Sequence, residues 1–138
     1  FMKMNCCWIK LRCKNDSDGN IVCSGSTSQQ WNMGGMLGKA TAGTLNITDC
    51  ENKCNISVAP PKGVSYLGGF VGRSGMTVNI NGGKNTGNLT LTQAQNHGMV
   101  GGVYGLIEGG TVTIDGVNNS GTIKSIASTY HGSYRTVG

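Results

Sequence analysis

The stretch "GGFVGRSGMTVNINGGKNTGNLT" (residues 68–90) decides the fold, because the chain contains two further versions of it. They read "GGMLGKATAGTLNITDCENKCNI" (34–56) and "GGVYGLIEGGTVTIDGVNNSGTI" (101–123). The copies share two glycines, two mostly apolar residues, a further glycine, an aliphatic-x-Ile pair, an Asn five residues after that Ile, and an aliphatic residue four positions later. Equivalent landmarks lie 33 or 34 residues apart. A repeat of this length predicts a stacked, solenoid architecture.

The apolar spacing within each copy predicts strands. Pairs such as Val78-x-Ile80 and Val112-x-Ile114 step by two, which is the alternation of a strand. Gly and Asn interrupt the copies too often for helices of ordinary length. We therefore predict three short strands per copy: 44–47, 55–58 and 33–37, then 77–80, 88–92 and 67–71, then 111–114, 122–125 and 99–104.

Strands that recur one period later can pair in parallel with their own equivalents, so that like side chains stack. Asn52, Asn85 and Asn119 should then form one column at a corner. The fold class predicted is all-β, a parallel β-solenoid of about four coils of 33–34 residues. Gly and Asn suit its corners, which need positive φ or close packing.

The 138 residues form one domain by length. We divide it into a divergent, Cys-rich first coil at 1–32, regular repeats at 33–125 and the start of a further coil at 126–138. In the last part, His131 and Gly132 align with His97 and Gly98. The chain begins with Phe and shows no signal peptide, so we expect a processed product or a segment of a longer protein.

Cysteines and glycosylation sequons favour an oxidising, secretory compartment. All six cysteines fall in the first 54 residues, and we take them as disulfide candidates: Cys6, Cys7, Cys13, Cys23, Cys50 and Cys54. Stacking would place Cys13 over Cys50, one of fifteen possible full pairings. Five sequons mark N-glycosylation candidates at Asn15, Asn46, Asn55, Asn88 and Asn118. The alternatives are a zinc site, although no His is well spaced for it, and sequons that arise by chance in an Asn- and Thr-rich repeat.

The motifs "GGMLG", "GGFVG" and "GGVYG", followed by turns such as "NTGNL" and "NNSGTI", resemble the GLUG-type repeats of large surface and adhesin-like proteins. The similarity covers residues 33–125. The period is longer here than in that repeat, and "KCN" stands in the copy at 34–56 where the next has "TGN". The resemblance implies a right-handed parallel β-helix in an extracellular protein used for surface display or adhesion. It implies no catalytic residues.

Side chains for catalysis or metal binding do not converge in the predicted stack. The six acidic residues form no column, since Thr48 falls over Asn81 and Asp115. His97 and His131 could stack as a two-His site, but no Ser or Cys nucleophile shares their period. We therefore expect no enzyme, no cofactor and no metal.

The sequence also argues against nucleic acid, a membrane and ice as binding partners. Net charge is +5 with scattered basic residues and no aromatic interleaving, which argues against nucleic acid. No apolar run is long enough to span a bilayer. An ice-binding face would need columns of Thr, yet Thr113 falls over Asn79, and Thr90 over Ser57.

We predict a secreted or cell-surface structural or adhesive glycoprotein segment that self-associates or continues end to end through open solenoid ends, with surface glycans as possible partners. The alternatives are a carbohydrate-binding or polysaccharide-degrading β-helix, whose sugar contacts the aromatic residues could supply, and an ice-binding solenoid.

Overall fold

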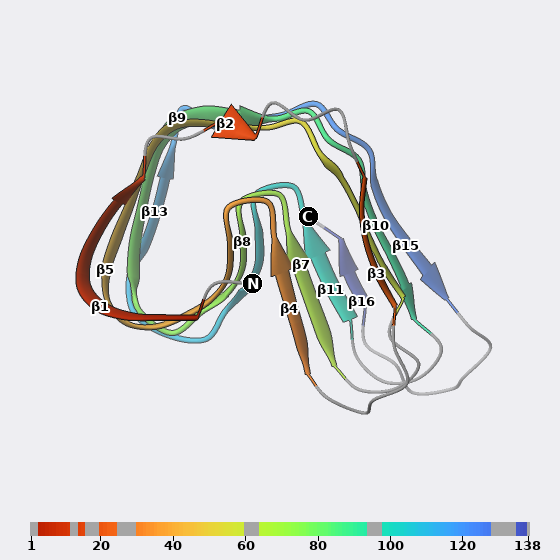
Figure 1. Ribbon diagram of the computed structural model, residues 1–138, viewed down its shortest axis with the longest axis horizontal. Coiled ribbons are helices and arrows are strands. Elements are labelled where there is room, and N and C mark those ends of the chain that lie inside the picture. The colour runs from red at the N-terminus through yellow and green to blue at the C-terminus, as the bar shows by residue number, and fades with distance from the viewer. Residues whose placement is uncertain are drawn as a thin grey trace.

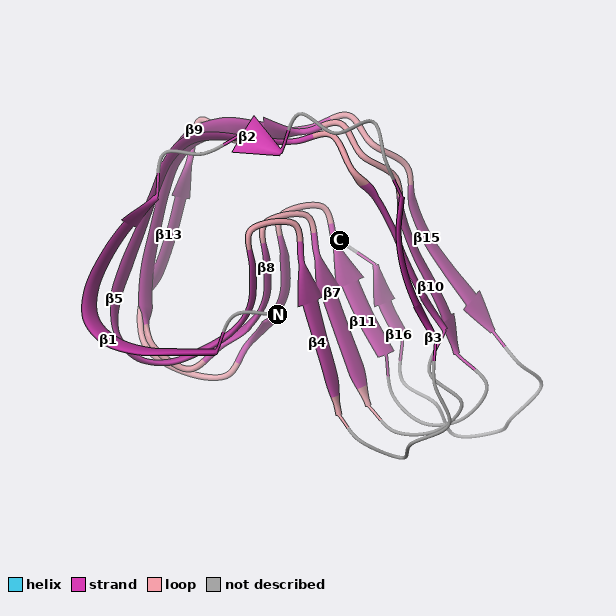
Figure 2. Ribbon diagram, viewed as in Figure 1, coloured by secondary structure: helices cyan, strands magenta, loops and turns pink. Residues whose placement is uncertain are grey.

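The computed structural model describes the backbone of residues 3–11, 14–15, 20–24, 30–59, 64–93, 98–127 and 135–137, and the side chains of 30–59, 64–92 and 98–126. Every regular element in these ranges is a strand, and none is a helix (Figure 2). All the strand pairs are parallel. The prediction of an all-β chain with parallel strands is confirmed.

The described strands form three sheets that wind around one axis (Figure 1). The first is a curled sheet of eight strands: β1 (Lys3–Leu11), β2 (Lys14–Asn15), β5 (Leu37–Asn52), β8 (Val71–Ser74), β9 (Thr77–Asn85), β12 (Tyr104–Ile107), β13 (Val112–Asp115) and β14 (Asn118–Asn119). The second has four strands: β3 (Asn20–Ser24), β6 (Asn55–Ala59), β10 (Leu89–Gln93) and β15 (Ile123–Ala127). The third also has four: β4 (Trp31–Gly34), β7 (Ser65–Gly68), β11 (Gly98–Gly101) and β16 (Arg135–Val137).

Equivalent residues of successive copies lie side by side in the sheets, as the sequence period predicts. Ile47 pairs with Leu11 on one side and with Ile80 on the other, and Ile80 pairs with Ile114. A second column runs through Ile21, Ile56, Leu89 and Ile123. Period-two alternation turns the side chains of Ile47, Ile80, Ile56 and Leu89 inward, where they are buried and form strips of core parallel to the axis.

The buried side chains fall into two clusters rather than one. One lies between β8 and the arc of β5 and β9 and includes Phe70. The other lies between β7 and β10 and includes Leu67, Leu89 and Leu91. Between the two clusters run β4, β7 and β11 on one side and β8 and β12 on the other (Figure 1). The cross-section therefore has two lobes, each with its own core.

The predicted single strand through each Gly-Gly element is wrong. A tight reversal at residues 69–70 separates β7 from β8, and residues 35–36 and 102–103 do the same in the neighbouring copies. The chain turns back on itself here, so β7 and β8 lie back to back between the lobes. The strands predicted at 44–47 and 77–80 are also longer than expected, because β5 and β9 continue around the corner as far as Asn52 and Asn85.

The third glycine of the "GGxxG" motif allows these back-to-back strands to touch. A Cβ on Gly72 would lie 2.6 Å from the backbone of Met33, and one on Gly105 would lie 2.8 Å from the nitrogen of Leu67. A Cβ on Gly38 would meet the carbonyl of Asn32 at 2.7 Å. We call this contact of backbone on backbone the glycine seam. Only residues without a side chain fit it.

The alignment predicted near the end of the chain is also wrong. Gly98 pairs with Arg135, not with Gly132, so the last repeat is three residues longer than the sequence match of His97 with His131 suggested. Both histidines lie outside the described residues.

Candidate functional site

An asparagine ladder runs along the axis at the junction of the two lobes. Asn52 Nδ2 donates to Asn85 Oδ1 at 2.6 Å, and Asn85 Nδ2 donates to Asn119 Oδ1 at 2.7 Å. Each Nδ2 also donates to the carbonyl two residues further on, at Cys54, Gly87 and Gly121. Asn52 and Asn85 are fully buried. The predicted Asn column is confirmed, but it lies inside the molecule rather than on an outer corner.

The ladder packs against the second glycine of each Gly-Gly turn. A Cβ on Gly35 would lie 2.6 Å from Asn52 Cγ, and one on Gly69 would lie 2.8 Å from Asn85 Cγ. Gly102 has the same relation to Asn119. The repeated Asn and the repeated second glycine therefore contact each other. The buried amide fits beside the turn only because glycine has no Cβ. Sequence reasoning found both features separately and missed the contact.

If the divergent residues 1–32 are counted as the first copy and the three repeats as the second to fourth, the last described layer of the ladder and the core columns is the fourth copy, residues 101–127. The outer edges of β12, β13 and β15 pair with no described strand. Ile107 and Ile114 are 49% and 45% exposed, whereas their partners in the third copy, Ser74 and Ile80, are buried. These side chains have the inward orientation of core residues and are covered by none of the described residues. We call this surface the open end.

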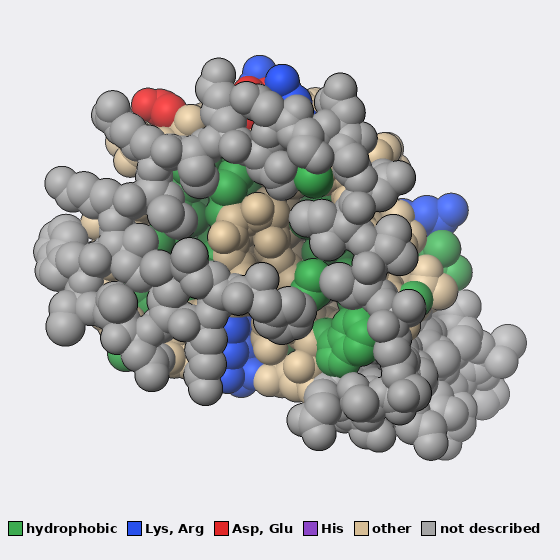
Figure 3. Space-filling view, viewed as in Figure 1, with side chains coloured by type: hydrophobic (Ala, Val, Ile, Leu, Met, Phe, Trp, Pro, Cys, Tyr) green, Lys and Arg blue, Asp and Glu red, His purple; other side chains and the backbone are tan. Residues whose placement is uncertain are grey.

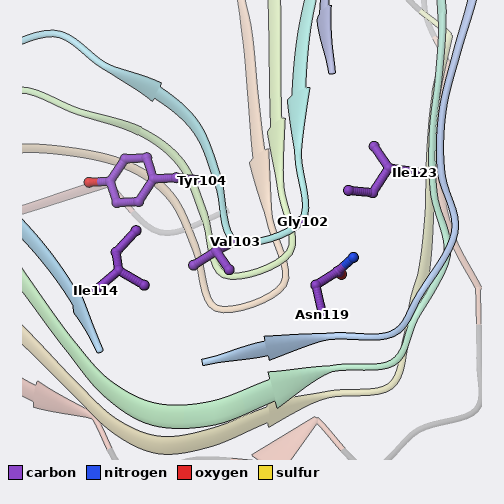
Figure 4. A pocket seen from close by; sticks show the side chains of 6 residues that line it. All are labelled: Gly102, Val103, Tyr104, Ile114, Asn119 and Ile123. Carbon is purple, nitrogen blue, oxygen red and sulfur yellow. The ribbon is translucent and has the colours of Figure 1, made fainter. Parts of the chain in front are cut away.

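A hollow of about 300 Å³ lies in the open end, lined by Gly102, Val103, Tyr104, Ile114, Asn119 and Ile123. Tyr104 and Ile114 lie on one side of the turn at Gly102 and Val103, and Ile123 lies on the other (Figure 4). Burial raises the pKa of the Tyr104 hydroxyl, an effect that the nearby Ser74 hydroxyl opposes. The hydroxyl is therefore neutral, and the hollow carries no ionised lining group.

The outer surface carries the described sequon asparagines. Asn88 and Asn118 are exposed, while Asn46 and Asn55 are half-buried. Three of them take part in bonds between copies: Asn46 Oδ1 accepts from Asn79 Nδ2, Asn55 Oδ1 from the backbone of Asn88, and Asn88 Oδ1 from that of Thr122, each at 2.9 Å. In each case the carbonyl oxygen is the bonding atom, and the side-chain nitrogen is the atom that a glycan would occupy. The side chain of Asn15 lies outside the described residues.

Charged side chains gather in two small clusters. Glu51, mostly buried, lies 3.1 Å from Lys84 and 3.9 Å from Lys53, beside a second hollow of about 290 Å³ lined by Asp49, Cys50, Glu51, Gly83, Lys84 and Asn118. Elsewhere, Arg73 bonds to both Gln30 and Glu108. Its guanidinium lies 5.5 Å from the ring centre of Tyr66. Donation from Arg73 lowers the pKa of the Glu108 carboxyl. In the face shown in Figure 3, the charged side chains lie toward the margin.

The remaining candidate residues are only partly visible. Cys50 and Cys54 are buried, whereas Cys13 and the side chains of Cys6, Cys7 and Cys23 lie outside the described residues, so the disulfide prediction stays a prediction. The columns that argue against an ice-binding face are present, because Thr113 pairs with Asn79 and Thr90 pairs with both Ser57 and Lys124.

Among the residues described, no group of three or more His, Cys, Asp or Glu side chains gathers as metal ligands would. In the same residues no helix has the length and apolar character to cross a bilayer. The sequence matches no protein-family model, and neither the curated proteins nor the solved structures include one that is similar to it.

Proposed function

We propose that the chain is a segment of a stiff, right-handed β-solenoid with a structural or adhesive role at a cell surface or outside the cell. It consists of about four coils, and its function is mechanical rather than catalytic. Backbone ladders and core columns along one axis give stiffness, because no coil can shift without breaking its hydrogen bonds to both neighbours. Outward Asn, Thr and Ser residues contact water, glycans or partners.

The observation that carries this proposal is the continuity of the stack. The Ile47 column and the asparagine ladder each pass through successive copies without a break in register. Such regular repetition serves length and rigidity. Within the described residues, no three or more His, Cys, Asp or Glu side chains gather as metal ligands would. The GLUG-type resemblance adds support for surface display, and the cysteines and sequons add support for secretion.

Antibody labelling of intact cells that express the chain tests this location. We expect labelling without permeabilisation, and a mobility shift after treatment with an N-glycosidase. Variants Asn88→Gln and Asn118→Gln, at the two exposed sequons, should each reduce that shift. Labelling that requires permeabilisation, together with an unchanged mobility, would contradict the proposal.

A second candidate function is carbohydrate binding at the hollow beside Glu51. Its lining offers two carboxylates, a lysine and an exposed Asn, which are groups that hydrogen-bond to hydroxyls. A polysaccharide panel separates the two functions. A scaffold should release no sugars and show no binding that Asp49→Ala weakens.

A further inference from the structure

One corner of the stack presents a chemically labile peptide unit at the surface. The chain contains a single Asn-Gly pair, Asn81-Gly82, and this pair lies on β9, between the strands β5 and β13. Asn81 pairs with Thr48 in the second copy and with Asp115 in the fourth, and it is exposed although described strands lie on both sides of it. We propose that Asn81 is a site of spontaneous deamidation, through which the stack is modified as it ages.

The reaction needs only the chain and water. The backbone nitrogen of Gly82 attacks Cγ of Asn81, so that a carbon–nitrogen bond forms, and Nδ2 leaves as ammonia with the proton that the backbone nitrogen has lost. The product is a cyclic imide. Water then adds to either carbonyl of the ring and opens it, which gives aspartate or isoaspartate at position 81. In isoaspartate the main chain passes through Cβ and is longer by that atom.

The fold requires the glycine that makes this reaction fast. A side chain on the residue after the Asn hinders ring closure, and glycine has none. Gly82 has φ +70°, in the left-handed region, and a Cβ there would overlap Oδ1 of Asp49. The equivalent residues of the neighbouring copies, Asp49 and Gly116, also have positive φ, at 50° and 62°. Any larger residue at position 82 would be strained, so the corner keeps the sequence that favours attack on Asn81.

The backbone ladder also leaves Gly82 out. On the side of the second copy, the paired residues of β9 run from Asn81 directly to Gly83. On the side of the fourth copy, they run from Asn81 to Lys84. Gly82 therefore forms a ladder pair with neither described neighbour. Its nitrogen can move toward the Asn81 side chain without separating a pair of strands.

Other outward asparagines of the described residues lack this combination. Asn79 is followed by a β-branched residue, and its Nδ2 donates to Asn46 Oδ1 at 2.9 Å. Asn119 is exposed, but a serine follows it and its Oδ1 accepts a hydrogen bond from Asn85. The modification should therefore be concentrated at Asn81.

Both products should weaken the corner. An aspartate at position 81 would place a carboxylate beside its ladder partner Asp115, and like charges on paired strands repel each other. An isoaspartate would add a main-chain atom just before Gly83, where pairing with the second copy resumes, and would displace the following residues from their register. Those residues include Asn85, the central member of the asparagine ladder.

Mass spectrometry of the folded 138-residue chain during storage at neutral and mildly alkaline pH tests the proposal. Trypsin should release residues 74–84, which contain both Asn79 and Asn81. We expect the mass increase from amide to acid at Asn81, and labelling of the same peptide by a protein isoaspartyl methyltransferase. The rate should rise with pH, because the deprotonated nitrogen is the nucleophile. It should lie within about tenfold of the rate in the free peptide, since opening one main-chain hydrogen bond slows a reaction by no more than that. A change confined to the free peptide, or one that is equal at Asn79, would overturn the proposal.

Asn81→Thr is the matched control, because Thr48 occupies this position in the second copy. After storage the variant should keep its urea midpoint, whereas the midpoint of the unmodified chain should fall. Asn81→Asp supplies the new charge on an ordinary main chain, so the fresh variant should lose less than the aged unmodified chain. All these chains keep the six cysteines, so any disulfide change during storage affects them alike. An unchanged midpoint in fully modified chain would overturn the weakening of the corner. Cell-surface labelling is independent of these results, so the proposed function and the deamidation can fail separately.

Discussion

Replacement of Asn85 by Ala tests the central contact of the fold. The substitution removes three hydrogen bonds, to Asn52, Gly87 and Asn119. Two of these partners, Asn52 and the Gly87 carbonyl, are in buried residues and would lose a bond that water cannot readily replace. A buried polar group left without its partner costs about 1–3 kcal/mol, so the loss of unfolding free energy should be about 2–6 kcal/mol. This is a large part of the ~5–15 kcal/mol that stabilises an ordinary domain.

The measurement is urea unfolding followed by far-ultraviolet circular dichroism at fixed pH. With a slope of about 2 kcal/mol per molar urea, the midpoint should fall by about 1–3 M. Asn119→Ala is the control, because Asn119 is itself exposed and the substitution breaks a bond to one buried group only, Asn85 Nδ2, which keeps its bond to the Gly87 carbonyl. Its cost should be about 1 kcal/mol. Equal midpoints for the two variants, or a loss below about 1 kcal/mol at Asn85, would refute the idea that the buried ladder stabilises the stack.

Three further predictions concern the turn, the core and an ion pair. Gly69→Ala should lower the urea midpoint strongly, because its Cβ would lie 2.0 Å from the Gly102 carbonyl, whereas Gly75→Ala, which meets nothing within 4 Å, should leave it nearly unchanged. Ile80→Ala should cost about 2–5 kcal/mol in the same assay through the cavity it leaves in a fully covered column; a cost like that of a surface site would argue against the column. The pKa of Glu108 is lowered from about 4.5 by Arg73, so its contribution to stability is complete above that pH and is lost as the pH falls through the folded-state pKa. Glu108→Gln should therefore flatten the acid limb of a plot of melting temperature against pH, and an unchanged limb would contradict the role of this carboxyl.

The sequence was sufficient to predict the columns. Alternation such as that of Val78 and Ile80 gives strands, and a constant period forces equivalent strands to pair, so the Ile47–Ile80–Ile114 column needed no further information. The hollow beside Ile114 could not be predicted, because its lining residues come from four separate places in the chain, at 102–104, 114, 119 and 123.

The Gly-Gly turn could not be predicted because the reason for it lies elsewhere in the chain. Two glycines suit a strand, a bulge or a reversal equally well from local preference alone. What selects the reversal at Gly69 is its contact with the buried Asn85, sixteen residues later. The alignment of His131 with His97 failed for a different reason. The sequence match of two residues, His-Gly, suggested a spacing of 34 residues, whereas the pairing of Gly98 with Arg135 shows that the last repeat is three residues longer.

The glycine seam has a consequence for elasticity. It joins two cores through main-chain atoms in direct contact, with no flexible side chains between them to be compressed. A beam whose material is spread along one direction of its section resists bending in that direction more than across it. The cross-section is longer across the two lobes than perpendicular to that direction (Figure 1). A stack of such sections should therefore bend more easily perpendicular to the line that joins the lobes than along it.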